Sequence, residues 1–289
     1  MSRSRPGSHR SSRAPGRTAR VAPADRGAGG DVVEGRQAVA ELLAAGRRAV
    51  IDVWVAAEAE QRSAPVIDRI IELAAARRVP LRRVSGARLS AEARTEAPQG
   101  VLAHARPLPE ADLDDLCRAK DAIGAGGPGP GPGAGAPFLL ALDGVTDPQN
   151  LGALLRTAEG AGVTGVVLPR HRAAHVTAAV TKAAAGAVEH VPIAVVGGLP
   201  AALARARELG LWVIGLDAGA DQSLFDLTLA DQAVVVVLGA EGRGLSRLVR
   251  QRCDLMVAIP LRGRLPSLNV SAAGALALFE ISRRRAPSS

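Results

Sequence analysis

The feature that most constrains the fold is an alternation of short apolar runs and helical patterns through the second half of the chain. The apolar runs, each of strand length, are 138–142, 165–168, 191–196, 211–216, 233–238 and 255–259. Segments with apolar side chains at helical spacing lie between several of them, at 150–161, 176–188, 199–209 and 268–283. Strands that are apolar on both faces, interleaved with helices, predict an α/β domain whose parallel sheet is covered by helices on both sides.

A stretch of alternating Gly and Pro, residues 121–137, predicts a solvated linker between two domains. The larger domain is predicted at 138–289 and a smaller one at 31–120, and each is long enough to bury a core. The smaller one has helical patterns at 34–46 and 64–77. Strand-like runs occur at 49–56, 79–84 and 100–105, so the sequence predicts a small α/β module.

The net charge of +8 is concentrated in the N-terminal tail. Residues 1–30 carry seven arginines against a single acidic residue, Asp25, with almost no apolar content. Such a segment cannot offset the entropy of ordering and is predicted to be disordered. It is either an arm that attracts polyphosphate or a solubilising tail.

Cysteine content and hydropathy indicate the compartment. The two cysteines, Cys117 and Cys253, could form one disulfide, but they provide no disulfide framework and no metal-ligand spacing. The basic N-terminus lacks the apolar segment of a signal peptide, and no run approaches the ~20 apolar residues that cross a bilayer. We therefore expect a cytoplasmic protein that needs neither a membrane nor a metal.

Polar loops follow several of the predicted strands, where ligands bind in parallel sheets. The first loop, 143–157, contains Pro148 and a helix cap, either Asp147 or Asn150. Arg156 lies off the apolar stripe of the following helix, one turn after Gly152, whose missing side chain would leave space beside it. A guanidinium at this position could grip a phosphate or a developing oxyanion, or could be a solvated surface group.

The second loop, 238–246, combines three glycines with Glu241. Gly239, Gly242 and Gly244 permit positive φ and close approach of the backbone to a ligand. Their order, G-x-x-G-x-G, is not the G-x-G-x-x-G fingerprint that a nucleotide-dependent oxidoreductase carries after its first strand. An ordinary strand-to-helix turn is the alternative.

The third loop follows the last strand and leads into the C-terminal helix. It contains Arg262 and Arg264 and then Ser267, Asn269 and Ser271. Small polar residues at a helix start are often only caps. Because the carboxyl ends of parallel strands share one edge, the three loops together predict a single site.

At these loops the chain resembles the SpoU (TrmH-like) family of the SPOUT superfamily. The family's D-x-Q-N-L-G-x-x-x-R is similar to 147–156, its L-G-x-E-G-x-G to 238–244 and its S-L-N-V-S to 267–271. The resemblance implies transfer of a methyl group from S-adenosylmethionine to a ribose 2′-hydroxyl of RNA. It also implies a deep trefoil knot in 138–289 and a homodimer.

The small domain extends the resemblance through EGRQAVAELL (34–43) and PQGVLA (98–103). These segments are similar to the L30e-like, RNA-binding domain of the subgroup that methylates a guanosine of 23S rRNA, in the peptidyl-transferase P loop. Alternatives are a tRNA 2′-O-methyltransferase, an rRNA methyltransferase that confers antibiotic resistance, and a non-catalytic RNA-binding scaffold.

The resemblance implies particular site residues. Arg156 is expected to be the main catalytic residue, with Asn150, Glu241, Ser267 and Asn269 completing the site. The pKa of a free arginine is above ~12, so we expect Arg156 to stabilise the alkoxide while the target's phosphate assists proton transfer.

The cofactor is expected to bind through the knot loops. The residues that the resemblance assigns to it are Gly239, Ile259 and Leu268, with Leu216 and Leu261 as further contributors.

Overall fold

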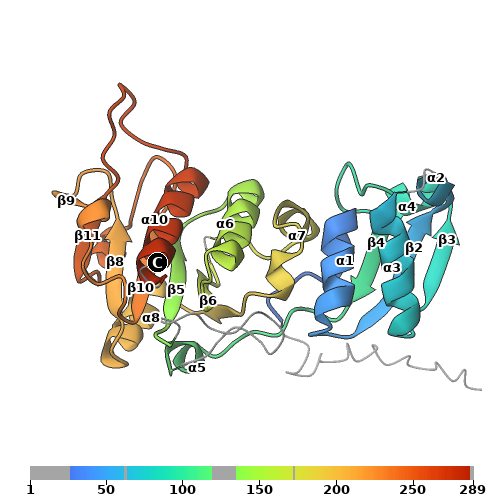
Figure 1. Cartoon of the computed structure of the whole chain (residues 1–289), viewed down its shortest axis with the longest axis horizontal. Helices are drawn as coiled ribbons and strands as arrows, with labels where there is room; N and C mark the ends of the chain where they lie inside the picture. The colour runs from blue at the N-terminus through green and yellow to red at the C-terminus, as the bar shows by residue number, and fades with distance from the viewer. Residues whose placement is uncertain (1–26, 62–63, 119–134, 172, 287–289) are drawn as a thin grey trace, which may run out of the picture.

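The computed structural model describes residues 27–61, 64–118, 135–171 and 173–286, which form two β-sheets (Figure 1). Most of the predicted tail (1–26) and of the predicted linker (121–134) lies outside the described residues. The two sheets and their helices lie side by side along the long axis of the molecule.

The smaller sheet has the order β1-β4-β2-β3. Its strands are β1 (Val32–Glu34), β2 (Val50–Ala56), β3 (Leu81–Val84) and β4 (Val101–Ala105). Helices α1 (Arg36–Ala45) and α3 (Pro65–Ala76) cover one face, while α2 (Ala57–Gln61) and α4 (Gly86–Glu92) contribute to a smaller cluster on the other. The small α/β module is thus confirmed, with β1, α2 and α4 as additions too short to show periodicity.

The larger sheet is parallel throughout, as predicted, with the order β7-β6-β5-β10-β8-β11-β9. Its strands are β5 (Phe138–Asp143), β6 (Gly165–Pro169), β7 (Ile193–Val196), β8 (Trp212–Leu216), β9 (Gln222–Ser223), β10 (Val234–Gly239) and β11 (Leu255–Ala258). Strand β10 lies between β5 and β8, so the loops after these three strands are neighbours at the centre of one edge.

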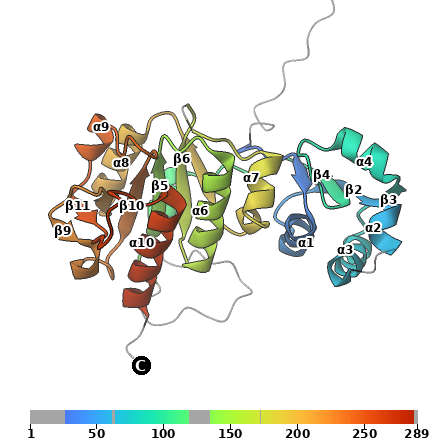
Figure 2. The same cartoon turned by 90° about the horizontal axis from the view of Figure 1, so that it is seen from above.

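Helices cover both faces of the larger sheet, because alternate strand residues point in opposite directions (Figure 2). Leu140 and Leu142 pack with α6 (Pro148–Gly160), α7 (Ala178–Ala183) and α10 (Val270–Arg285). Leu139 and Ala141 pack with α5 (Leu113–Arg118), α8 (Leu199–Glu208) and α9 (Arg247–Arg250). Two 3-10 turns complete the described elements, η2 (Ala187–Glu189) and η3 (Leu224–Asp226).

One predicted helix, 176–188, is shorter than expected. It ends at Ala183 and is followed by the separate turn η2. The backbone between them takes positive φ at Ala185 (50°) and Gly186 (88°), which a continuing helix cannot accommodate.

The segments that flank the small sheet both contact the part of the chain that forms the larger α/β unit. Gly29 forms a parallel bridge with Val176, and the Ala111 N–H donates to the Ile193 carbonyl at 2.8 Å. Helix α5 buries Leu116 in the core of the large sheet, beneath α8.

A buried ion pair lies where the two parts meet. Arg48 of the small part donates from Nε to Oε2 of Glu189 in η2 at 3.1 Å, and the two side chains are 2% and 1% exposed. The Arg48 guanidinium also donates to the carbonyls of Gly30 and Arg106, and Arg47 donates to the Glu189 carbonyl. Every face of this charge pair is therefore satisfied by protein.

Among the described residues, no helix combines the length and apolarity needed to span a bilayer. Both cysteines are free, and burial raises the pKa of the Cys117 and Cys253 thiols to about 11. The thiols therefore stay protonated near neutral pH and are poor nucleophiles.

Candidate active site

The candidate site lies at the carboxyl edge of the large sheet, around the ends of β5, β10 and β8. Asp143 and Gly239 are direct register partners at the ends of β5 and β10. The Asp143 carboxylate accepts a hydrogen bond from the Ser246 N–H at 2.6 Å, which ties the second loop to the end of β5.

The first loop is organised by Asp147, which caps α6. Its carboxylate accepts from the N–H groups of Gln149 and Asn150 at 3.1 and 3.3 Å. Capping by Asp147 leaves the Asn150 side chain available for other loops. The space expected beside Gly152 is filled by α7, since a Cβ added there would lie 2.4 Å from the Ala183 Cβ.

The second loop folds back over the end of its own strand. The Gly244 N–H donates to the Ala240 carbonyl at 2.8 Å, and Gly242 and Gly244 have positive φ of 77° and 64°. A Cβ on Gly239 would lie 2.2 Å from the Gly244 carbonyl carbon. The turn therefore requires glycine at 242 and 244 for its positive φ angles. Gly239 is required because a side chain there would collide with the backbone at Gly244.

A chain of hydrogen bonds joins the three loops. Asn150 Nδ2 donates to Glu241 Oε2 at 3.4 Å, and Asn269 Nδ2 donates to Asn150 Oδ1 at 3.0 Å. Asn269 Oδ1 in turn accepts from the Ser271 N–H at 2.9 Å and caps α10. Asn269 is thus both a helix cap and a tertiary link, and the three loops converge.

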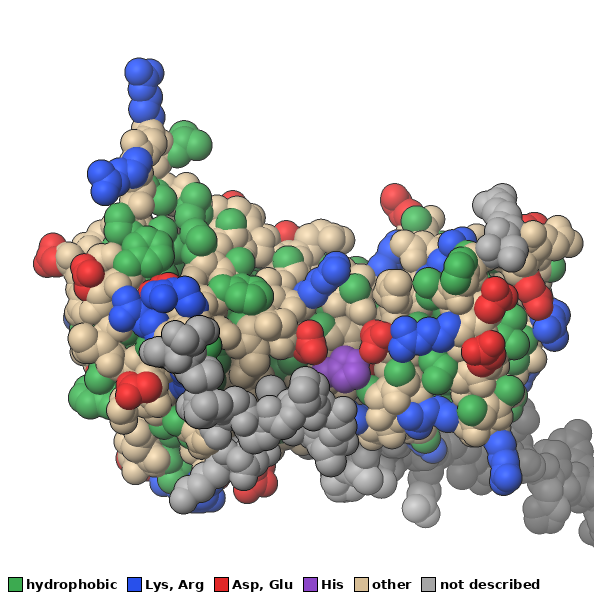
Figure 3. Space-filling model, viewed as in Figure 1, with side chains coloured by type: hydrophobic (Ala, Val, Ile, Leu, Met, Phe, Trp, Pro, Cys, Tyr) green, Lys and Arg blue, Asp and Glu red, His purple; other side chains and the backbone are tan. Residues whose placement is uncertain are grey.

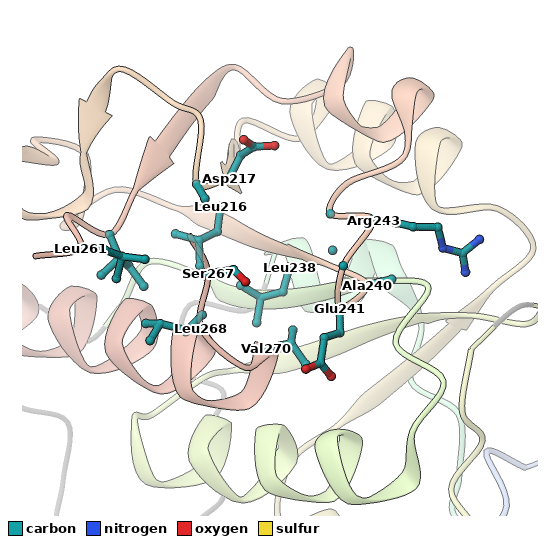
Figure 4. Close-up of a pocket in the computed structure, with 16 residues that line it drawn as sticks. Leu216, Asp217, Leu238, Ala240, Glu241, Arg243, Leu261, Ser267, Leu268 and Val270 are labelled. Carbon is teal, nitrogen blue, oxygen red and sulfur yellow. The ribbon is translucent and has the colours of Figure 1, made fainter. Parts of the chain in front are cut away.

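A cavity of about 320 Å³ lies beside this chain of hydrogen bonds (Figure 4). The residues expected to bind the cofactor all line it: Leu216, Gly239, Ile259, Leu261 and Leu268. Glu241 and Ser267 line it as well. Its volume is within the ~300–1,000 Å³ of small-molecule sites, and its mixture of apolar walls and a few polar groups is typical of them.

The cavity suits S-adenosylmethionine in charge as well as in size. Leu216, Leu261 and Leu268 provide apolar contact, and the Glu241 carboxylate places a negative charge at the wall of a cavity whose proposed ligand has a positive sulfonium. The residues present therefore fit the cofactor.

Three of the expected catalytic residues do not line the cavity. Asn150 is connected to the cavity by its hydrogen bond to Glu241, which lines it. Asn269 is bonded to Asn150 and directly follows the lining residue Leu268. Arg156 is exposed on α6 and makes no hydrogen bond or ion pair with any described residue. A single chain thus leaves this guanidinium free at the surface.

Sequence reasoning missed other residues of the cavity, notably Asp217, Arg243 and Val270. Asp217 directly follows β8, so the rule that selected the other loops could have found it. Its carboxylate accepts from Arg250 at 2.9 Å. Arg243 lay inside a recognised motif, but at a position that the motif leaves variable.

Comparison with known proteins gives two family matches that together span most of the described chain. The sequence model of the SpoU rRNA Methylase family matches residues 137–279. The model described as RNA 2'-O ribose methyltransferase substrate binding matches residues 32–111. The first contains all three loops, and the second contains the small sheet.

Curated relatives match over nearly their whole length. The putative TrmH family tRNA/rRNA methyltransferase YacO of Bacillus subtilis is 35% identical, over 89% of this chain and 97% of that protein. The 23S rRNA (guanosine-2'-O-)-methyltransferase RlmB of Pseudomonas aeruginosa is 40% identical, over 88% of this chain and 97% of its own length.

A solved structure shares the fold. The SpoU methyltransferase AviRb from Streptomyces viridochromogenes, in complex with AdoMet, superposes with a TM-score of 0.67 at 24% identity, covering 88% of this chain and 89% of that one. The fold, the cavity and the converging loops define an S-adenosylmethionine-dependent RNA 2′-O-methyltransferase. The chain belongs to the SpoU family.

Proposed function

We propose that this protein methylates the 2′-hydroxyl of a guanosine in 23S rRNA, acting in the cytoplasm as a homodimer. Support for the substrate comes from the curated RlmB relatives, whose resemblance extends over the small sheet as well as the catalytic part. The observation that carries the activity is the hydrogen-bonded junction of Glu241, Asn150 and Asn269 beside the cavity.

The proposed cofactor site uses the walls of the cavity. Leu216, Ile259, Leu261 and Leu268 would hold the apolar parts of S-adenosylmethionine, and the close turn at Gly239 presents backbone groups to it. When bound, the cofactor supplies a methyl group already activated on a sulfonium. The chain therefore has to align the ribose oxygen and manage its proton.

In the proposed mechanism each polar residue has a separate task. Ser267 and Asn269 position the target ribose and its phosphate, and Asn150 holds the Glu241 loop against them. Arg156 stabilises the negative charge that develops on the 2′-oxygen, while the proton of the hydroxyl passes to the target's phosphate. Since Arg156 lies outside the cavity of one chain, bound RNA or a second subunit has to complete the site.

The proposed dimer is supported by an exposed apolar surface on α10. Leu276 and Phe279 are 44% and 51% exposed, and Phe279 lies against the end of α6 near Gly160. Large apolar side chains exposed next to one another on a helix surface are typical of an interface. A second copy covering α10 would also approach α6, which carries Arg156.

From the family we also expect the trefoil knot.

The proposed function is tested by mapping 2′-O-methyl groups in 23S rRNA and tRNA from cells with and without the gene. We expect one guanosine of 23S rRNA to lose its methyl group and to regain it when the purified protein acts on that RNA. Loss at a tRNA site would assign the tRNA alternative. Unchanged methylation together with no heat of binding for S-adenosylmethionine would assign a non-catalytic scaffold.

A further inference from the structure

Arginines without any protein partner gather at the carboxyl edge of the large sheet. Among the described residues, the arginine side chains that make no hydrogen bond, ion pair or ring contact are Arg78, Arg156, Arg243, Arg247, Arg252, Arg262 and Arg264. Arg156 is already assigned to the reaction. Arg243 lines the cavity after β10, and Arg262 and Arg264 lie in the third loop between the lining residues Leu261 and Ser267. Three of the set therefore lie in loops that border one cavity.

Two of the loops place these charges on opposite sides of the cavity mouth. Arg243 lines the cavity between Gly242 and Gly244, and its side chain extends outward, away from Leu261 and Leu268 (Figure 4). The third loop borders the cavity through Leu261 and Ser267. Between these two residues it projects from the body of the molecule, with cationic side chains at its tip (Figure 3).

These unpaired arginines have no evident role in stabilising the fold. Away from this edge most described arginines pair with carboxylates or carbonyls, as Arg205 does with Asp114 and Arg48 with Glu189, and Arg78 and Arg252 are the exceptions. Leu265, in the same loop as Arg262 and Arg264, is 77% exposed. Among the described residues, the two cations of this loop have no partner and its most exposed leucine is not covered, so the loop is arranged for a partner outside the chain.

We propose that Arg243, Arg262 and Arg264 grip backbone phosphates of the RNA strand on the two sides of the target ribose. The inference rests on the proposed function, because a ribose can reach the methyl donor only if its strand crosses the mouth of this cavity. Guanidinium groups bind phosphate through two parallel hydrogen bonds, and a fork on each side of the cavity fixes the strand's path. The grip reads the backbone and leaves the choice of base to other contacts.

The test compares RNA binding by the wild type and by the triple variant Arg243→Ala, Arg262→Ala and Arg264→Ala. The ligand is transcribed 23S rRNA, titrated between about 50 and 200 mM salt. Each lost phosphate contact lowers the salt slope by about 0.7 on a single strand, so the slope should fall by about 2. Raising the salt fourfold should then weaken the wild type roughly 20-fold more than the variant.

Arg78 and Arg252 provide the matched control. Both are exposed and equally without partners, but Arg78 follows α3 of the small part and Arg252 lies near the start of β8, at the opposite edge of the large sheet. The double variant Arg78→Ala, Arg252→Ala should keep the wild-type RNA affinity and salt slope. A triple Arg→Lys variant should recover most of the slope and only part of the affinity, since lysine keeps the charge and loses the fork.

The outcomes separate this inference from the proposed function. The triple Ala variant should retain its thermal stability and oligomeric state, with a raised KM for RNA. An unchanged slope in a triple variant whose wild type still methylates 23S rRNA would overturn the grip alone. Equal losses in the control variant, or dissociation of a dimer in the triple variant, would also overturn it. A wild type that binds RNA but methylates none would refute the proposed function. The phosphate grip would then still be tested by the salt dependence of RNA binding in the wild type and the triple variant.

Discussion

Two regions of this molecule use arginine in opposite ways. At the junction between the two sheets, Arg48 is buried against Glu189 and donates to two further carbonyls. At the carboxyl edge of the large sheet, Arg156, Arg243 and Arg262 are exposed and meet no protein acceptor among the described residues. The difference teaches that burial and pairing, rather than residue type, separate a charge that holds the fold from one that we propose to bind the substrate.

The largest expected effect comes from breaking the buried pair. Arg48→Ala leaves the Glu189 carboxylate buried without its cation, and the free energy of unfolding should fall by about 3–5 kcal/mol. Chemical denaturation measures this loss, with Arg78→Ala as the exposed control, which should change stability by no more than about 0.5 kcal/mol. Similar stabilities for the two variants would remove the distinction between the regions.

The next effect concerns the unpaired edge and appears in activity alone. Arg156→Ala should reduce single-turnover methylation by about 100- to 1,000-fold, because a preorganised group that stabilises developing charge is lost. Its S-adenosylmethionine affinity, measured by calorimetry, and its melting temperature should match the wild type, since the side chain makes no hydrogen bond or ion pair with any described residue. Normal single-turnover methylation by this variant would refute the assigned role.

A smaller loss of activity is expected when the hydrogen bonds that join the three loops are broken. Asn150→Ala removes two hydrogen bonds, one to Glu241 and one from Asn269, and kcat should fall about tenfold as the loops lose their alignment. Glu159→Ala, an exposed change on the same helix, is the control and should leave kcat unchanged. If both variants behave alike in steady-state assays, the hydrogen-bonded junction is not what aligns the loops.

The smallest effect tests a paired charge cluster near the end of α10. Hydrogen bonds from Arg283 and Arg284 lower the pKa of Glu280 to about 2, from an ordinary value of 4.5. A lowered folded-state pKa gives stability that is present above pH 4.5 and is lost as the pH falls toward 2. Glu280→Gln should therefore cost at most about 1 kcal/mol at pH 7, and almost nothing near pH 2. Thermal melts of both proteins across this range measure the difference, and a constant gap would contradict the assignment.

The sequence predicts the large sheet well because its signals are local. The apolar runs at 138–142 and 233–238 match β5 and β10, and the polar loop after each belongs to the site. The expected cofactor residues line one cavity because motif order and strand ends fix their position. The elements that hydrophobic periodicity could not reveal are the short ones, such as β9 with two residues and α9 with four.

Contacts between distant residues are beyond such reasoning. Arg48 and Glu189 are 141 positions apart, and neither belongs to a pattern that identifies the other. The filled space beside Gly152 depends in the same way on α7, which packs there through Ala183. The sequence therefore indicated which loops carry the chemistry, and the structure was needed to show which charges remain free.

The central position of β10 has a consequence for how the protein is made. During synthesis β5 emerges long before β10, the strand that must lie between β5 and β8, and β8 emerges shortly before it. The growing sheet therefore has open edges on β5 and β8 until residue 239 is available. The third loop and α10 emerge later still. A nascent chain therefore cannot assemble the candidate site until α10 has been made, and its unpaired strands are the segments most prone to aggregation before then.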